Sequence, residues 1–397
     1  MKIFRRSGFW VVAPALVVWA ACGTSDAPTE ALEATEWRID SLPEFEVGGH
    51  DDRPEYTLFN VASATRLSDG RVVVANSGTS QLRYYGPDGT HLFDVAGEGG
   101  GPGELRFIFD VVRIAGDSLV VFSRDPGLTW YDPEGRYVRS ERRNMFGVEH
   151  HPCRFGEGPN WRLMPDATLL RLLVDNFAPA NCPPRPEGPF RWTGLLGIPS
   201  PDGERFDTIA ILPATERVGS NYRVFGHDLL LAMDSAVILA GDTGSDSILA
   251  LGLQGDTVRI LPNPFESRAV PEELKDEGLR EVRQSDGSTR FMPGFSDYPD
   301  AFPPYARLLV DEDGFVWVMQ YPIPDEPLNS WRFAQPYGNA VPEDGASWRV
   351  LGPDGLVVAD LITPPGLFPL EIGSDYVLGL SHDEFDVETI KLYRLHR

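Results

Sequence analysis

Polar side chains recur at one position of successive short segments, a common distance before a tight turn. That position holds Ser63, Asp110, Asn160, Asp228, Arg307 and Phe368. Four of these residues are strongly polar where the neighbouring apolar residues predict a half-buried strand. Carboxylate and amide oxygens are ligands for divalent cations, so Asp110, Asn160 and Asp228 are candidate metal ligands. Arg307 in the same set would weaken metal binding, and the alternative is that the whole set lines a water-filled channel.

Aromatic and arginine side chains form a second candidate site, in two long loops. The aromatic residues are Phe291, Phe295, Tyr298, Phe302, Tyr305, Trp331, Phe333 and Tyr337, and the arginines are Arg268, Arg280, Arg283, Arg290 and Arg332. Aromatic faces and planar guanidinium groups suit sugars, peptides and carboxylates. We take Tyr298 and Trp331 as the candidate binding residues. The alternative is that these aromatic residues form a satellite core that packs the loops onto the domain.

Paired turns at regular intervals show which elements carry these residues. One set has Pro-Asp-Gly or a variant at 87–89, 133–135, 201–203, 255–256 and 353–355, and a second set lies upstream at 68–70, 116–117, 165–166, 233–234, 313–314 and 374–375. Short apolar runs separate the turns. A unit of four strands repeated along the chain predicts an all-β propeller.

The strands group into six blades. Expected ranges are 61–67, 71–75, 81–85 and 91–95; 109–114, 118–123, 128–131 and 137–140; 161–164, 168–174, 192–198 and 205–211; 229–232, 236–240, 247–253 and 257–261; 306–310, 315–320, 347–351 and 356–361; and 367–372, 376–380 and 389–395. The last blade has only three strands. We expect residues 37–39 and 45–47 to pair with it and close the ring, because an open edge strand invites aggregation.

Long insertions are confined to one face of the predicted disc. The turns between first and second strands, and between third and fourth strands, are all short, whereas residues 144–160, 175–191, 262–304 and 321–346 form long connections on the opposite side. Loops of this length in a compact domain commonly carry function. Within them, residues 271–284 have the start and end signals of a short helix, which we expect to act as a lid or a brace.

The N-terminus has the features of an export signal. Lys2, Arg5 and Arg6 precede an apolar stretch at 9–18, and small residues lead to Cys22. The block around Cys22 resembles a bacterial lipobox, although Trp19 stands where leucine is usual. We therefore predict a lipoprotein-type signal peptide at 1–21, a flexible tether at 22–36 and the propeller at 37–397, with cleavage of an ordinary signal peptide near Ala20 as the alternative. Cys22 would be lipidated, and Gly23 after it would permit sorting to the outer membrane.

The net charge limits the expected binding partners of the protein, and the cysteine content indicates a disulfide pair. The chain has 59 acidic against 35 basic residues and a formal charge of −24, which disfavours nucleic acid and anionic lipid surfaces. We expect membrane contact through the lipid anchor alone, and a monomer. In an oxidising exported compartment, Cys153 and Cys182 are the natural disulfide pair.

The layout resembles the six-bladed NHL-repeat propellers, especially the bacterial six-bladed propeller lipoproteins. The most specific feature is the link at 97–105, Gly-Glu-Gly-Gly-Gly-Pro-Gly-Glu-Leu. No established activity accompanies that family, so the resemblance implies a fold and a location in the cell envelope or outside the cell.

Three functions follow as hypotheses. The first is a binding module, without a cofactor, that holds a peptide, a glycan or an envelope protein on the insertion-bearing face. The alternative is a metal-dependent hydrolase or lyase that resembles the gluconolactonase, streptogramin lyase or amidating lyase propellers, with a divalent metal on the axis. A structural scaffold is the third, because one fold serves many functions.

Overall fold

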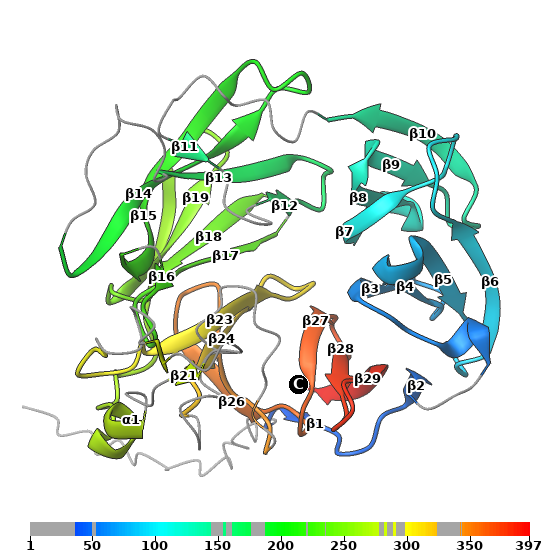
Figure 1. Cartoon of the computed structure of the whole chain (residues 1–397). Helices are drawn as coiled ribbons and strands as arrows, with labels where there is room; N and C mark the ends of the chain where they lie inside the picture. The colour runs from blue at the N-terminus through cyan, green and yellow to red at the C-terminus, as the bar shows by residue number, and fades with distance from the viewer. Residues whose placement is uncertain are drawn as a thin grey trace, which may run out of the picture. The chain divides into compact units, whose positions relative to one another are not determined.

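The chain folds as a six-bladed β-propeller (Figure 1). The structure, a computed structural model, describes residues 36–49, 53–143, 154–155, 161–175, 187–219, 221–234, 236–277, 282–283, 289–290, 298–323, 342 and 344–397. Residues Glu36–Arg397 form one compact unit, and all described residues belong to it. No helix among them is long and apolar enough to span a membrane.

Each blade is an antiparallel sheet whose strands follow chain order. The strands of the first two blades are β3 (Val61–Arg66), β4 (Val72–Asn76), β5 (Gln81–Tyr85) and β6 (His91–Ala96), then β7 (Arg106–Arg113), β8 (Leu119–Asp125), β9 (Gly127–Tyr131) and β10 (Tyr137–Arg142). Those of the fourth and fifth are β17 (Leu229–Met233), β18 (Val237–Asp242), β19 (Ser247–Gly252) and β20 (Thr257–Pro262), then β23 (Tyr305–Val310), β24 (Val316–Gln320), β25 (Ser347–Leu351) and β26 (Val357–Ile362).

The core lies between neighbouring blades. All five residues of β4 are buried, as the continuous run of Val72, Val73 and Val74 predicts for a strand packed on both faces. Leu82 and Tyr84 of the first blade pack with Leu119 and Val121 of the second, and similar clusters join the other blades. The six-bladed fold predicted from the repeated turns is therefore confirmed.

The N-terminal segment closes the ring. The sixth blade has three strands of its own, β27 (Phe368–Ile372), β28 (Tyr376–His382) and β29 (Glu388–His396). Two short strands, β1 (Arg38–Ile39) and β2 (Phe45–Gly48), both pair antiparallel with β29 and supply the missing outer strand. Trp37 packs edge-on against Phe315 of the fifth blade, with ring centres 5.1 Å apart. The predicted closure is confirmed, and it also ties the sixth blade to its neighbour.

Strand register defines the two faces of the disc. In the first blade, Arg66, Val72, Tyr85 and His91 lie at one level, so the first-to-second and third-to-fourth turns lie on one face. We call this the turn face. The second-to-third connections and the links between blades lie at the opposite ends of the strands. We call that side the insertion face.

The third blade is longer than predicted. Its strands are β11 (Arg154–Phe155) and β12 (Trp161–Leu163), which both pair with β13 (Leu169–Asp175), followed by β14 (Pro189–Pro199), β15 (Phe206–Val218) and β16 (Asn221–Tyr222). The expected third strand began at 192 and the expected fourth strand ended at 211. In the structure β14 begins at Pro189 and β15 ends at Val218, and these two residues pair. Strand β13 pairs only with residues 194–197 of β14. Residues 189–193 of β14 and 213–218 of β15 pair with each other beyond this point, and we call this two-stranded extension the arm.

The predicted helix is shorter than expected. The described helix α1 covers only Glu272–Glu277 of the expected range 271–284. The end of that range forms strand β21 (Val282–Arg283), which pairs with β22 (Thr289–Arg290). Leu274 of α1 is buried against Val270, Phe302 and Tyr321. This packing fits the brace that we expected.

Candidate functional site: the axial channel

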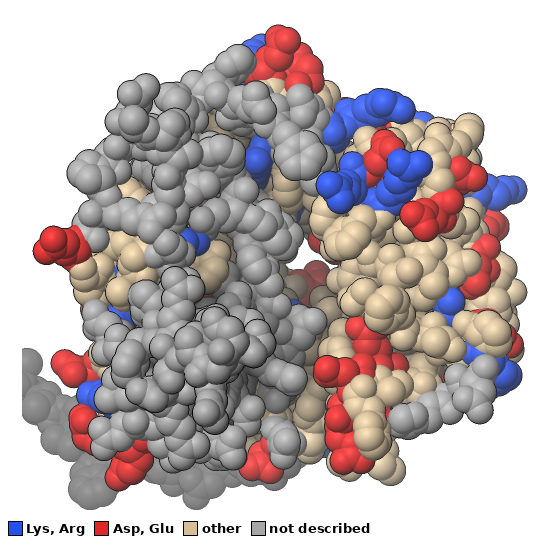
Figure 2. Space-filling model, in the orientation of Figure 1, with Lys and Arg blue, Asp and Glu red and all other residues tan. Residues whose placement is uncertain are grey.

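A channel with a volume of about 770 Å³ runs between the innermost strands. Every blade contributes, because the first strand of each propeller blade faces the axis. The turn-face end includes Arg113, Asp234, Asp311 and Glu312, which lie at or just after the ends of innermost strands. The space-filling view shows an opening near the centre of the molecule (Figure 2).

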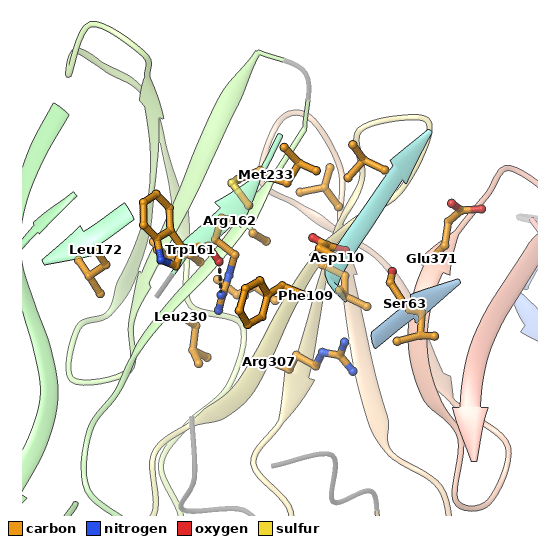
Figure 3. A pocket seen from close by; sticks show the side chains of 18 of the residues that line it. Ser63, Phe109, Asp110, Trp161, Arg162, Leu172, Leu230, Met233, Arg307 and Glu371 are labelled. Atoms are coloured by element: carbon orange, nitrogen blue, oxygen red, sulfur yellow. Dashed lines mark hydrogen bonds between the residues drawn. The ribbon is translucent and has the colours of Figure 1, made fainter. Parts of the chain in front are cut away.

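The structure brings most of the predicted polar positions together in this channel. Ser63, Asp110, Asp228, Arg307 and Phe368 all line it. Figure 3 shows Ser63, Asp110 and Arg307 among the side chains of this channel. Phe368 begins β27 and Asp228 immediately precedes β17, whereas Ser63, Asp110 and Arg307 lie within β3, β7 and β23. Asn160, the sixth member, lies outside the described residues. The common offset from the first turn therefore identified five lining residues, and their roles stay predictions.

Asp110 is a carboxylate held in a strongly desolvating position. It lies on β7 and is half-buried, because the channel leaves part of its surface open to water. Protein surrounds it on the other sides, and this desolvation raises the pKa of Asp110 to about 6. A hydrogen bond of 2.8 Å from the Val111 backbone amide and the charge of Arg162 act in the opposite direction.

Asp228 is fixed by its neighbours at the start of β17. Its Oδ1 accepts hydrogen bonds from the Thr215 hydroxyl at 2.5 Å and from the Leu229 amide at 2.8 Å, while its own amide donates to Thr243 Oγ1 at 2.7 Å. Burial raises the pKa of Asp228, and these bonds and the charges of Arg191 and Arg162 oppose that rise. Its carboxylate is thus held in place by the protein.

Arg307 differs from both carboxylates, because among the described residues its Nη1 has no hydrogen-bond partner. It lies on β23, and its guanidinium carbon sits 3.5 Å from the centre of the Phe368 ring. Its buried Nη1 has no hydrogen-bond partner within the part of the chain that the structure describes. Burial, with the like charge of Arg162, lowers the pKa of Arg307 to about 9. The cation is therefore in an unfavourable environment.

Sequence reasoning missed two further charged groups of the channel. Arg162 of β12 influences Asp110, Asp228 and Arg307, so it is central to the electrostatics. It lies two residues after Asn160 in the sequence, and the period of two expected for a strand was the available signal. Glu371 of β27 also lines the channel and accepts hydrogen bonds from the Thr65 hydroxyl, the Tyr376 hydroxyl and the Arg66 amide.

The arm of the third blade forms one wall near the insertion face. Ala214, Thr215 and Arg217 of β15 line the channel. Arg191 of β14 anchors the arm by donating to the Ala214 carbonyl at 2.6 Å and to Asp242 Oδ1 of the fourth blade at 2.5 Å. Such an inter-blade anchor could not be read from strand periodicity.

The second candidate site is only partly described. Tyr298 is half-buried and packs against Phe225, with ring centres 5.5 Å apart, beside Phe302 and Tyr321. This arrangement matches the satellite core that we gave as the alternative, and a binding role for Tyr298 stays a prediction. Trp331, the lipidation candidate Cys22 and the disulfide candidates Cys153 and Cys182 lie outside the described residues.

The geometry offers little to a metal ion. Among the residues described, no three His, Cys, Asp or Glu side chains are grouped as metal ligands. Asp110 and Asp228 share the channel with four arginines, and the charge of Arg162 acts on both carboxylates. A cation would have to bind against that positive charge.

Comparisons with known proteins identify the fold and no family. No protein-family model matches the sequence, and no curated protein matches it. Among solved structures, the chain is similar to a DUF4221 family member from Bacteroides vulgatus, with 11% identity, a TM-score of 0.52, and coverage of 92% of this chain and 100% of that one.

Two other structures are more distant. A protein described as exported, from Bacteroides fragilis, has 12% identity and a TM-score of 0.42, with coverage of 93% and 98% of the two chains. The calcium-binding protein regucalcin from Agrobacterium tumefaciens has 11% identity and a TM-score of 0.39, with coverage of 89% and 97%. At such identities a structural likeness supports the fold alone.

Proposed function

We propose that this protein is an exported binding module that holds a ligand in the axial channel, entered from the insertion face. The observation that carries this proposal is the channel itself, whose volume of about 770 Å³ lies in the range typical of ligand pockets. Its walls combine apolar side chains, such as Phe109, Trp161 and Leu230, with charged groups that converge on the same space. A peptide or a glycan is the expected ligand.

We infer the direction of entry from the arm of the third blade and from the long connections. Asp228 immediately precedes β17 on the insertion-face side, and the arm borders that end of the channel. The expected long connections belong to the same face. Loops on a rigid scaffold are the usual carriers of binding residues.

Filling the channel tests this function. We expect Ser63→Trp to abolish binding, because an indole at this lining position occupies the space that the ligand needs. Ser63→Ala is the matched control, since it removes the hydroxyl and adds no bulk. Both proteins are incubated with peptide and glycan fractions of an envelope extract, and native mass spectrometry records the bound masses.

Changes on the turn face provide a second control. Asp88, Glu134 and Asp202 lie in the short outer turns of three blades, away from the channel. Their replacement by Ala should leave the bound masses unchanged. Retention of ligand by Ser63→Trp, or its loss from the turn-face variant alone, would show that the channel is not the binding site.

A further inference from the structure

We propose that the channel binds the carboxylate group of an organic monoanion, which pairs with the guanidinium of Arg307. This inference rests on the proposed binding function and names the ligand chemistry. It concerns Arg307, a channel side chain for which the described residues provide no counter-ion (Figure 3).

The guanidinium of Arg307 has an N–H donor group without a hydrogen-bond partner among the described residues. A guanidinium carries five N–H donors, and buried donors are nearly always hydrogen-bonded in native proteins. Arg307 stacks on Phe368, which contacts its planar face, while its buried Nη1 has no partner in the described part of the chain. Stacking leaves the donor edge of the guanidinium available for a planar acceptor.

No carboxylate among the described residues pairs with Arg307. The charge of Arg162, which has the same sign, adds to the effect of burial in lowering the pKa of Arg307. Asp228 is bonded to Thr215 and Leu229, and Glu371 is bonded to Thr65, Tyr376 and Arg66. The protein thus directs its carboxylates elsewhere, although an unpaired buried charge is costly.

The geometry and the charge of the channel favour a carboxylate over other anions. A carboxylate matches the planar guanidinium fork with two parallel hydrogen bonds. Asp110, Asp228 and Glu371 line the same channel and repel a dianion such as phosphate more strongly than a monoanion. Phe109, Phe368 and Leu230 supply apolar walls, so the carboxylate should be attached to an apolar or aromatic group or to the face of a sugar ring.

Binding of defined probes tests this inference on the mature chain. Phenylacetate, the N-acetylated dipeptide acetyl-glycyl-phenylalanine and galacturonate represent a simple, a peptide and a sugar carboxylate, and each is compared with its neutral amide by calorimetry. We expect at least one carboxylate to bind about 10-fold or more tightly than its amide, because charge-assisted pairs are the stronger hydrogen bonds. The probe that binds most tightly identifies the source of the carboxylate.

Variants of Arg307 locate the effect. Arg307→Met should reduce the affinity for the carboxylate to that of the amide, and Arg307→Lys should give an intermediate value. Arg124→Met is the matched control, because Arg124 is an exposed arginine of the second blade and does not line the channel. Arg307→Met should melt at or above the temperature of the unchanged protein, since it removes an unpaired charge. That measurement separates lost binding from unfolding.

Each contrary result has a distinct meaning. Equal affinity for acids and amides, both lost in Ser63→Trp, would overturn the carboxylate inference and leave the channel function standing. Tighter binding of inorganic phosphate than of any carboxylate would also overturn it. Discrimination that persists in Arg307→Met would place the anion elsewhere. If no probe binds and the extract yields no ligand that Ser63→Trp excludes, both proposals fail.

Discussion

Single residues in the channel carry charges under different constraints. Asp110 and Arg307 both face a water-filled space and are otherwise surrounded by protein, so desolvation disfavours the charged form of each. Asp110 has the charge of Arg162 and the Val111 amide to compensate it, whereas Arg307 has an aromatic ring. Asp110 therefore has compensating interactions for its buried charge, whereas the guanidinium of Arg307 has N–H donors that can still bind a ligand.

Asp110 should make the protein more stable as the pH falls toward 4. Its pKa is about 6 in the folded chain and near 3.9 when unfolded, so between these values the native state holds a proton that the unfolded state does not. The gain reaches about 3 kcal/mol at most, and less to the extent that water in the channel screens the group. Relative to the unchanged protein, Asp110→Asn should be more stable at pH 7, and this advantage should shrink by pH 4.5.

Urea unfolding of both proteins at the two pH values measures this difference. Asp88→Asn provides a control of opposite sign, because hydrogen bonds from Thr90 lower the pKa of Asp88 on an exposed turn. The stabilising contribution of Asp88 is present at neutral pH and decreases as the pH falls through its lowered pKa. A pH-independent difference between Asp110→Asn and the unchanged protein would contradict the assignment of Asp110.

At the scale of elements, two segments decide how the propeller differs from a plain ring of sheets. The arm of the third blade turns strand residues such as Thr215 and Arg217 into channel wall, and Arg191 anchors it to the fourth blade. The N-terminal strands complete the sixth blade, and Trp37 extends this contact to the fifth. Both segments act across a blade boundary.

Removal of residues 37–47 should destroy cooperative folding. The deletion would expose the edge of β29 and remove Phe45 and Val47 from the core between the sixth and first blades. We expect the loss of a single melting transition, or aggregation, in calorimetry of the purified protein. The substitution Leu42→Ala in the same segment is the control, because this side chain is 77% exposed. If the truncated protein melts like the intact one, the ring is held by other contacts.

At the scale of the whole molecule, the full chain has a net charge of −24, and the surface of the propeller carries both acidic and basic side chains. Arginine side chains gather over the second blade, where Arg106, Arg124 and Arg142 are exposed (Figure 2). The overall charge favours solubility and disfavours binding to anionic surfaces. Attachment to a membrane therefore needs a covalent anchor, for which Cys22 is the candidate.

The anchor predicts a clear partition experiment. In a Gram-negative expression host, the unchanged protein should enter the detergent phase and incorporate labelled palmitate, because two or more acyl chains are needed for stable attachment. Cys22→Ala should remain in the aqueous phase with an unchanged melting temperature. Substitution of Cys153, which belongs to the proposed disulfide pair, should leave the label in place. An unlabelled intact protein would favour the ordinary signal peptide.

Local patterns were sufficient to predict the fold and the position of the channel. The turns, such as Pro87 to Gly89, depend on residues that adopt special backbone angles, and Gly89 has the positive φ of 79° that this turn requires. The common offset from the first turn of each blade then placed Asp110 and Arg307 on innermost strands and Asp228 immediately before one. These properties depend on neighbours a few residues away, so the amino-acid sequence by itself determined them.

Only the tertiary structure decided which polar groups are satisfied. Asp228 bonds with Thr215 because the arm of the third blade reaches the fourth, Glu371 bonds with Thr65 across the junction of the sixth and first blades, and Arg307 meets Phe368 instead of a carboxylate. Such pairings join residues that are up to about 300 positions apart. Hydrogen bonds and desolvation depend on distances between blades, which strand and turn patterns do not encode.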